Sequence, residues 1–234
     1  MANPVEMFPV QGIGEVVSGD DVAGLLWEAI TAGPITIADG DIIVITHKIV
    51  SKAEGRVVSA ATEEDYRRAV IDEAAAIVRR RGDLVIAQTR HGFICANAGV
   101  DRSNVEGDRI VLLPERPDRS AATIKNRIEA LSGAAIAVII SDTFGRPWRR
   151  GLTDVAIGVA GMAAINDLRG TTDMHGRVLD VSEVAVVDEI AGAADLVMGK
   201  STGIPAAIVR GVHWEPAPGR AADLVRPATE DMFR

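Results

Sequence analysis

Two short, largely apolar runs, each followed abruptly by polar residues, constrain the fold more than any other feature of the sequence. The first is residues 41–46 (DIIVIT), and the second, residues 135–140 (AIAVII), stops at Ser141-Asp142-Thr143. Runs of this length, rich in β-branched residues, are typical of buried strands. No run reaches 18 apolar residues, so the sequence predicts a soluble protein that does not span a membrane.

Further elements are predicted along the chain. A capping-box pattern at residues 62–65 (TEED) begins a helix that places Tyr66, Val70, Ala74, Ile77 and Val78 on one face and runs through residue 81, with Gly82 after it. Other helices are expected at 21–32, 120–131 and 183–198, and strands at 84–87, 110–113 and 206–209. The mixture predicts an α+β (mixed α/β) fold. We see no long linker, so residues 1–234 are expected to form one domain, with two subdomains as the alternative.

Composition narrows the functional classes. The formal net charge of −8 argues against non-specific nucleic-acid binding, so an anionic substrate would need local lysine, arginine or a metal ion. Cys95 is the single cysteine, which excludes an intrachain disulfide and fits a cytoplasmic protein. It lies in an apolar run and is expected to be a buried small hydrophobe. The four histidines lack the spacing of a zinc site.

Polar residues follow the first apolar run. Residues 46–56 (THKIVSKAEGR) place His47, two lysines and an arginine directly after a buried strand. Side chains at strand ends converge on ligands, and lysine binds phosphate as a point charge. The alternative is an ordinary solvated exit from the strand.

Residues 97–104 (NAGVDRSN) gather oxygen-bearing side chains in a short stretch. Asp101, Ser103 and Asn104 offer carboxylate, hydroxyl and amide oxygens, which suit a hard cation or a ribose. The alternative is an ordinary Asx turn.

The second apolar run ends in the segment of most chemical character, residues 141–151 (SDTFGRPWRRG). Asp142 and Thr143 would hold a divalent ion that bridges phosphate oxygens. Arg146, Arg149 and Arg150 have no acid among them and would repel one another unless an anion collects them. We therefore expect Asp142, Arg146 and Arg149 to act in catalysis.

Residues 198–203 (MGKSTG) contain Gly-Lys-Ser but are not a P-loop. That motif needs a glycine where Ala194 stands, and the expected context is reversed, with a helix before and a strand after. A glycine-rich turn of this kind can still present backbone amides to a nucleotide. The alternative is a helix end capped by Gly199.

Taken in order, the chain carries VQGIGEV (10–16), GDIIVITHKIVSKAEGR (40–56), NAGVDRSNV (97–105), SDTFGRPWRRGLTDVAIGVAG (141–161), VSEVAVVDEIAGAADLVMGK (181–200) and VRG (209–211). In this order the segments resemble the coenzyme F420-0:L-glutamate ligase (F420 gamma-glutamyl ligase) family over essentially the whole chain. The sequence looks most similar to the actinobacterial form, in which this domain is fused to a C-terminal nitroreductase-like domain.

The resemblance implies a family-specific α+β fold that forms an intertwined homodimer. It also implies GTP as co-substrate and two divalent ions, Mg²⁺ or Mn²⁺, with K⁺ as a further candidate cofactor. Asp101 and Asp142 would bind one metal ion, and Thr143 would help to bind the second. The residues implied in nucleotide contacts are Ile13, Gly14, Glu15, Val16, His47, Lys52, Asn104, Gly199, Lys200 and Ser201. His47 stands where serine or threonine is expected.

The implied reaction joins L-glutamate to F420-0. Transfer of the GTP γ-phosphate to the lactyl carboxylate of F420-0 would give an acyl phosphate, which the glutamate amine attacks. This route requires no enzyme nucleophile, and no nucleophile motif is present. The alternatives are a metal-dependent nucleotide phosphohydrolase and a non-catalytic nucleotide-binding or dimerisation domain.

Two sequence features also suggest self-association. The small apolar residues 156–161 (AIGVAG) and a tail from residue 214 rich in proline and glycine are expected to pack loosely or to leave apolar surface that needs cover. A homodimer would supply that cover.

Overall fold

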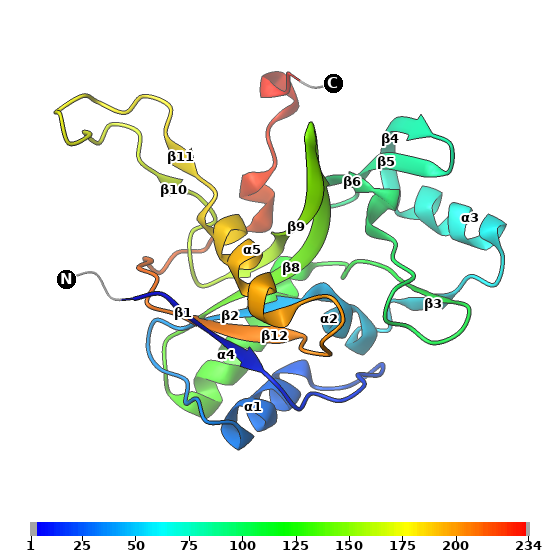
Figure 1. The fold of residues 1–234 in the computed structure, drawn as a ribbon, viewed down its shortest axis with the longest axis horizontal. Coiled ribbons are helices and arrows are strands. Elements are labelled where there is room, and N and C mark those ends of the chain that lie inside the picture. The colour runs from blue at the N-terminus through cyan, green and yellow to red at the C-terminus, as the bar shows by residue number, and fades with distance from the viewer. Residues whose placement is uncertain (1–3, 233–234) are drawn as a thin grey trace.

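The computed structural model describes residues 4–232 and shows a mixed α+β fold built on a five-stranded sheet, which confirms the predicted fold class (Figure 1). The two apolar runs form its middle, where β2 (Ile42–Thr46) and β8 (Ala137–Arg146) pair in parallel. The remaining pairs are antiparallel, in the order β1-β12-β2-β8-β9. The other three strands are β12 (Ala206–Arg210), next to β2, and the edge strands β1 (Glu6–Val10) and β9 (Arg149–Ala160).

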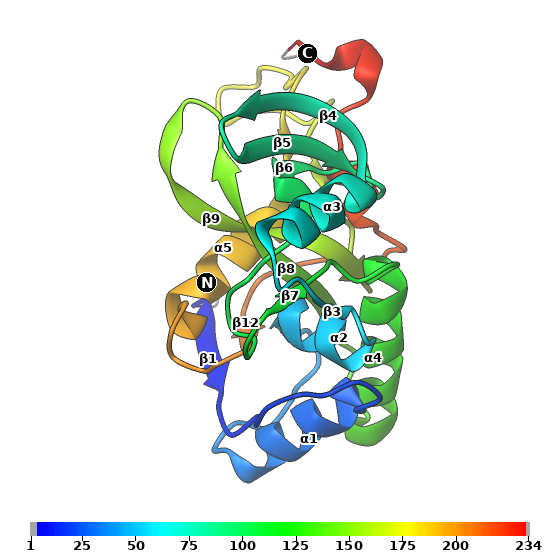
Figure 2. The ribbon, with the colours of Figure 1, turned by 90° about the vertical axis from the view of Figure 1, so that its right-hand side faces the viewer.

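Helices cover both faces of this sheet. Figure 2 shows α5 (Val186–Met198) on one side and α4 (Pro117–Ser132) on the other, with α1 (Val22–Ala32) packed beside α4. The contact between α4 and β9 is close, because a Cβ atom on Gly158 would lie 2.7 Å from the backbone carbonyl of Pro117. Residues 156–160 of β9 are therefore buried by helices of the same chain. The expectation that this face needs cover from a second copy is wrong.

A smaller cluster of buried apolar side chains, which includes Val70, Val85 and Ile110, lies beside the main core. Its elements come from the middle of the chain and include a three-stranded sheet, β4-β5-β6, and a two-stranded one, β3-β7. They are β3 (Val57–Ser59), α3 (Glu63–Glu73), β4 (Ala74–Arg81), β5 (Leu84–Thr89), β6 (Ile94–Ala96), the 3-10 turn η1 (Asn97–Gly99) and β7 (Arg109–Val111).

The helix predicted from residue 62 to residue 81 is correct only in its first half. Its capping box is present, because the Thr62 hydroxyl accepts a hydrogen bond from the Asp65 backbone N–H and the Asp65 carboxylate accepts one from Thr62. The helix ends at Glu73, and the segment up to Arg81 is strand β4, which folds back on β5. Strand pairing overrides the helical pattern here, and Gly82 with φ 59° makes a hairpin turn rather than a helix end.

Other boundaries also differ from the prediction. The strand expected to stop at residue 140 continues to Arg146, because it pairs with β9 along the whole hairpin. The residues after β2 form a helix, α2 (His47–Ala53), rather than a solvated exit. The helix expected from residue 183 begins at Val186, since β11 (Glu183–Val184) precedes it and pairs with β10 (Asn166–Asp167).

The tail after residue 214 is better packed than expected. The indole N–H of Trp214 donates a 2.9 Å hydrogen bond to the Gly40 carbonyl, and Ala221 is buried in the main core. Two short 3-10 turns lie in this tail, η2 (Ala221–Leu224) and η3 (Ala228–Glu230). Within residues 4–232, no helix is long and apolar enough to cross a membrane.

Candidate active site

A cavity of about 560 Å³ lies at the ends of the two central parallel strands. Thr46 of β2 pairs with Ser141 of β8, so the residues that follow both strands come to the same edge of the sheet. This is the edge at which open sheets bind ligands, and the first and third polar segments both reach it. A β-bulge between Ile140 and Ser141 interrupts the pairing with β9 at this point.

Segments far apart in the sequence line the cavity. The predicted residues that line it are Ile13, Gly14, Glu15, Val16, Lys52, Asn104, Asp142, Thr143, Gly199 and Lys200. The rejection of a P-loop is confirmed, because α5 precedes the Gly199 turn and β12 follows it. Gly199 caps the end of α5 with φ 65°, which was the alternative to a nucleotide-binding turn. The same turn also lines the cavity.

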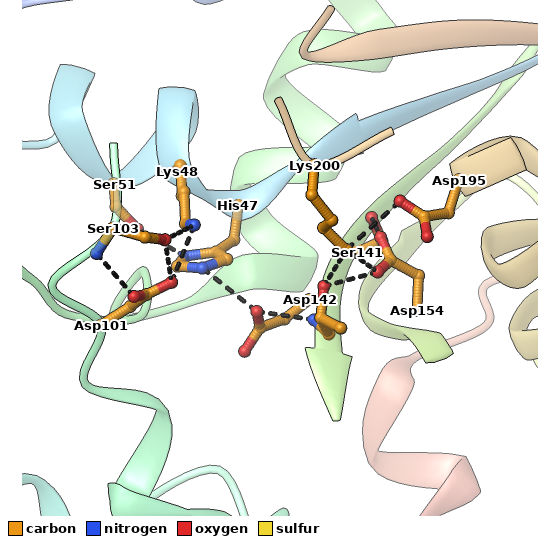
Figure 3. Close-up of polar contacts among 11 residues, drawn as sticks. His47, Lys48, Ser51, Asp101, Ser103, Ser141, Asp142, Asp154, Asp195 and Lys200 are labelled. Atoms are coloured by element: carbon orange, nitrogen blue, oxygen red, sulfur yellow. Dashed lines mark hydrogen bonds and ion pairs between the residues drawn. The ribbon is translucent and has the colours of Figure 1, made fainter. Parts of the chain in front are cut away.

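His47, at the start of α2, lies beside Asp142 (Figure 3). Its Nδ1 is 3.2 Å from the Ser51 hydroxyl, and its Nε2 is 3.3 Å from Asp142 Oδ1. Among the described residues this buried nitrogen has no hydrogen-bond partner. The imidazole is 1% exposed and lies outside the cavity lining, so it packs beside Asp142 and does not reach a nucleotide directly.

Asp101 is held by neighbours from its own turn and from α2. Its Oδ1 accepts a 2.7 Å hydrogen bond from the Ser103 backbone N–H, which is the Asx turn anticipated as the alternative. Its Oδ2 lies 2.7 Å from Lys48 Nζ and 2.9 Å from the Ser103 hydroxyl. Burial raises the pKa of Asp101, but the hydrogen bonds from Lys48 and Ser103 outweigh it, so the pKa lies below its ordinary value.

A second charged group lies across the cavity, around Lys200. Its Nζ is 2.7 Å from Asp154 Oδ1 and 3.2 Å from Asp195 Oδ1, and it donates a short hydrogen bond to the Thr143 hydroxyl. Thr143 in turn donates to Asp154 Oδ1 at 2.6 Å, and Ser141 donates to Asp154 Oδ2 at 2.9 Å. Both oxygens of this 5%-exposed carboxylate are therefore satisfied.

Three acidic residues that line the cavity, Glu106, Asp154 and Asp195, were missed by the sequence analysis. Asp154 lies directly opposite Thr143 in the β8–β9 pairing. The available signal was a lone aspartate in the apolar strand-like segment 152–160, since a buried carboxylate needs partners. Asp195 carries no comparable signal, because acidic residues are common on helix surfaces.

The structure does not bring every predicted residue to the cavity. Asp101 and Ser201 do not line it, although each adjoins a segment that does. Arg146 and Arg149 lie at the far end of the β8–β9 hairpin, which projects away from the sheet in Figure 2. There Arg146 Nη2 donates a 2.8 Å hydrogen bond to the Arg150 carbonyl. Their predicted catalytic role stays a prediction.

Lys52 and Glu15 connect the N-terminal loop to α2. The Lys52 ammonium donates a 2.6 Å hydrogen bond to Glu15 Oε1, so the loop at residues 13–16 closes one side of the cavity. Asn104 on the opposite loop adopts φ 58°, a left-handed conformation that asparagine tolerates better than most residues. The Lys52 side chain and these two loops thus border the cavity.

The donor set fits one divalent ion better than two. Among the described residues, no three His, Cys, Asp or Glu side chains come together in a way that could hold a metal ion. Asp101 and Asp142 still offer two carboxylates, and Mg²⁺ commonly binds through one or two carboxylates together with water and substrate phosphates. The second predicted position, at Thr143, fits less well, because the Lys200 ammonium contacts that hydroxyl and two further carboxylates. At the first position, Lys48 contacts a single carboxylate, that of Asp101.

Cys95 takes no part in this chemistry. Its side chain is buried, as predicted, and burial, together with the nearby Asp142 charge, raises the pKa of the thiol to about 12.

Comparison with known proteins places these residues in a family. The sequence model of F420-0:Gamma-glutamyl ligase matches residues 12–211. The chain is 41% identical over 249 residues to the coenzyme F420:L-glutamate ligase of Methanothermobacter thermautotrophicus, covering 98% of this chain and 99% of the relative. It is 43% identical over 215 residues to the enzyme of the same name from Methanocaldococcus jannaschii, covering 85% and 86%. The corresponding ligase of Methanopyrus kandleri is 39% identical over 251 residues, covering 98% and 97%.

Proposed function

The chain belongs to the F420-0:gamma-glutamyl ligase family, and from this premise we propose that it joins L-glutamate to coenzyme F420-0 with GTP as the energy source. Membership makes it a ligase of F420 biosynthesis. One observation supports the GTP-dependent reaction most strongly. The segments implied in nucleotide contacts all meet at one cavity, which is lined by Lys52 and, from another segment, by Lys200.

The absence of a nucleophile motif favours an acyl-phosphate route. A carboxylate is a poor acyl donor because its leaving group would be oxide. The γ-phosphate of GTP is transferred to the lactyl carboxylate, giving GDP and an acyl phosphate. The amine of L-glutamate then attacks the activated carbonyl, forming the amide bond and releasing phosphate. The protein's contribution is positioning and neutralisation of charge.

Three lysines supply positive charge around the cavity. Lys52 and Lys48 project from α2, and Lys200 projects from the turn after α5. Each is paired with a carboxylate, Lys52 with Glu15, Lys48 with Asp101 and Lys200 with Asp154. GTP phosphates would take over part of these contacts on binding, and backbone amides of the Gly199 turn would add donors.

Asp142 and Asp101 would hold one divalent ion beside the phosphates. Such an ion supplies neutralisation of the charge that develops on the transferred phosphoryl group. Asp142 Oδ1 accepts a 2.7 Å hydrogen bond from the Thr143 backbone N–H. Lys48 and Ser103 hold Asp101 in the same way. These contacts hold both carboxylates in place before the substrates bind.

We also propose that the functional unit is a homodimer. Support comes from two projecting segments, the end of the β8–β9 hairpin and the arm that joins β10 to β11. The first exposes Trp148 (81%) and Leu152 (68%), and the second exposes Met174 (92%) and Val181 (86%). Large apolar side chains on projecting segments are typical of surfaces that another chain covers.

Release of phosphate from GTP tests the proposed reaction directly. Release that requires both F420-0 and L-glutamate, with a product heavier by one glutamyl residue, is the expected result. Release without the acceptors would indicate a nucleotide phosphohydrolase instead. Intact GTP binding with no phosphate release under any condition would indicate a non-catalytic nucleotide-binding module.

A further inference from the structure

The position expected for a second divalent ion already contains a positive charge. The Lys200 ammonium contacts three oxygens, which belong to Thr143, Asp154 and Asp195. An ammonium has three N–H donors, so these three acceptors satisfy it completely. The oxygens come from three separate segments, β8, β9 and α5, which the fold brings to one side of the cavity.

Geometry excludes a metal ion from this position while Lys200 occupies it. A divalent ion would bind the same oxygens at about 2.0 to 2.6 Å, which places it where the ammonium nitrogen now lies. A lysine ammonium is positively charged at neutral pH and also repels a nearby cation.

Charge balance supports the same interpretation. Asp154 and Asp195 carry two negative charges and receive one positive charge from Lys200. Without the ammonium, a buried carboxylate, a second carboxylate and a threonine hydroxyl would face the cavity together. That donor set suits a hard divalent cation.

We infer that Lys200 replaces the second divalent ion, so that this chain uses one metal ion, on the Asp101 and Asp142 side, and one tethered ammonium on the Thr143 side. The inference depends on the proposed function only where it assigns the first metal ion to Asp101 and Asp142. The ammonium then faces the substrate phosphates with half of its side chain exposed (55%), while Asp154 and Asp195 position it.

Counting bound Mn²⁺ tests the inference without any turnover. The full chain is titrated with Mn²⁺ alone, and the bound ions are counted from the loss of the free-ion signal in electron paramagnetic resonance. We expect one ion per wild-type chain and two per Lys200→Gln chain. Lys125→Gln is the matched control, because Lys125 pairs with a single carboxylate, Glu129, outside the cavity lining. This control should bind the same number of ions as the wild type.

Thermal unfolding with and without Mn²⁺ checks that the Lys200→Gln variant is folded. Lys200→Gln leaves two carboxylates unpaired, and Mn²⁺ should raise its thermal midpoint by more than it raises that of the wild type, because ligands that bind the native state stabilise it. Lys200→Ala should behave like Lys200→Gln.

The possible counts separate this inference from the proposed function. Two ions in the wild type, or no additional ion in either Lys200 variant, would overturn the inference. No ion in the wild type and one in the Lys200 variants would support the inference while refuting the Asp101 and Asp142 metal position.

Discussion

Replacing Asp154 by alanine should destabilise the protein, because this carboxylate organises the interior side of the site. Its two oxygens accept hydrogen bonds from Ser141, Thr143 and Lys200, and its side chain is 5% exposed. Ser141 is fully buried, so its unpaired hydroxyl would cost about 1 to 3 kcal/mol. Thr143 is partly exposed and water replaces part of its loss, which limits that cost to about 1 kcal/mol.

The lost contact with Lys200 contributes less to the destabilisation caused by Asp154→Ala. Lys200 is half exposed and keeps Asp195, so the loss of its pairing with Asp154 should cost about 0 to 1 kcal/mol. We therefore expect Asp154→Ala to lower the free energy of unfolding by about 3 kcal/mol. Asp154→Asn has nearly the same shape and keeps acceptor and donor groups, so it should lower the free energy by only about 1 kcal/mol.

Urea unfolding followed by circular dichroism measures both values. All proteins are compared at one fixed concentration, because association would change the apparent stability. Asp195→Ala is the matched control, since it removes the other, more exposed partner of Lys200 and should cost less than about 1 kcal/mol. An Asp154→Ala variant within 1 kcal/mol of the wild type would refute the reasoning.

Asp142→Ala should abolish ligation with an unchanged circular dichroism spectrum, because the metal loses a ligand; near-wild-type ligation at ordinary Mg²⁺ or Mn²⁺ would contradict this. Arg149→Ala should lower kcat/KM for F420-0 about tenfold, or about 1.4 kcal/mol, and Arg149→Lys should restore only part, since lysine lacks the bidentate fork. Unchanged kinetics would assign the hairpin end a solvated role. Sedimentation at micromolar concentration should show a dimer rather than an active monomer. Iodoacetamide at mildly alkaline pH should label Cys95 in urea but not in the native protein, because its pKa is about 12.

The centre of the fold could be predicted from the sequence because burial leaves a strong local pattern. The two apolar runs became β2 and β8, and the helix at residues 120–131 became the middle of α4, closed by Gly133 with φ 75°. The segment 74–81 could not be predicted in the same way. Its apolar residues fit a helix face, and only pairing with β5, a contact made by another segment, makes it a strand.

The site shows the same division between local and long-range information. Residues that follow the two apolar runs in the sequence, such as Lys52, Asp142 and Thr143, could be selected because side chains at strand ends often converge on a ligand. The arginines at the hairpin end were selected on equally local grounds. Their distance from the cavity depends on how far β8 and β9 continue to pair, and the sequence pattern carries no signal for that length.

Lys200 shows most clearly why assigning residues one by one is insufficient. The sequence analysis assigned Thr143 to a metal ion and, through the family resemblance, Lys200 to the nucleotide, as two separate roles. The structure places both groups at one point, because the turn after α5 lies against the β8–β9 hairpin and Asp154 holds the two side chains together. An ammonium on a short tether has a high effective concentration at these oxygens and does not need to be recruited from solution. One half of the cavity is therefore neutralised by the chain itself, whereas under our proposal the other half, at Asp142, would take a bound ion.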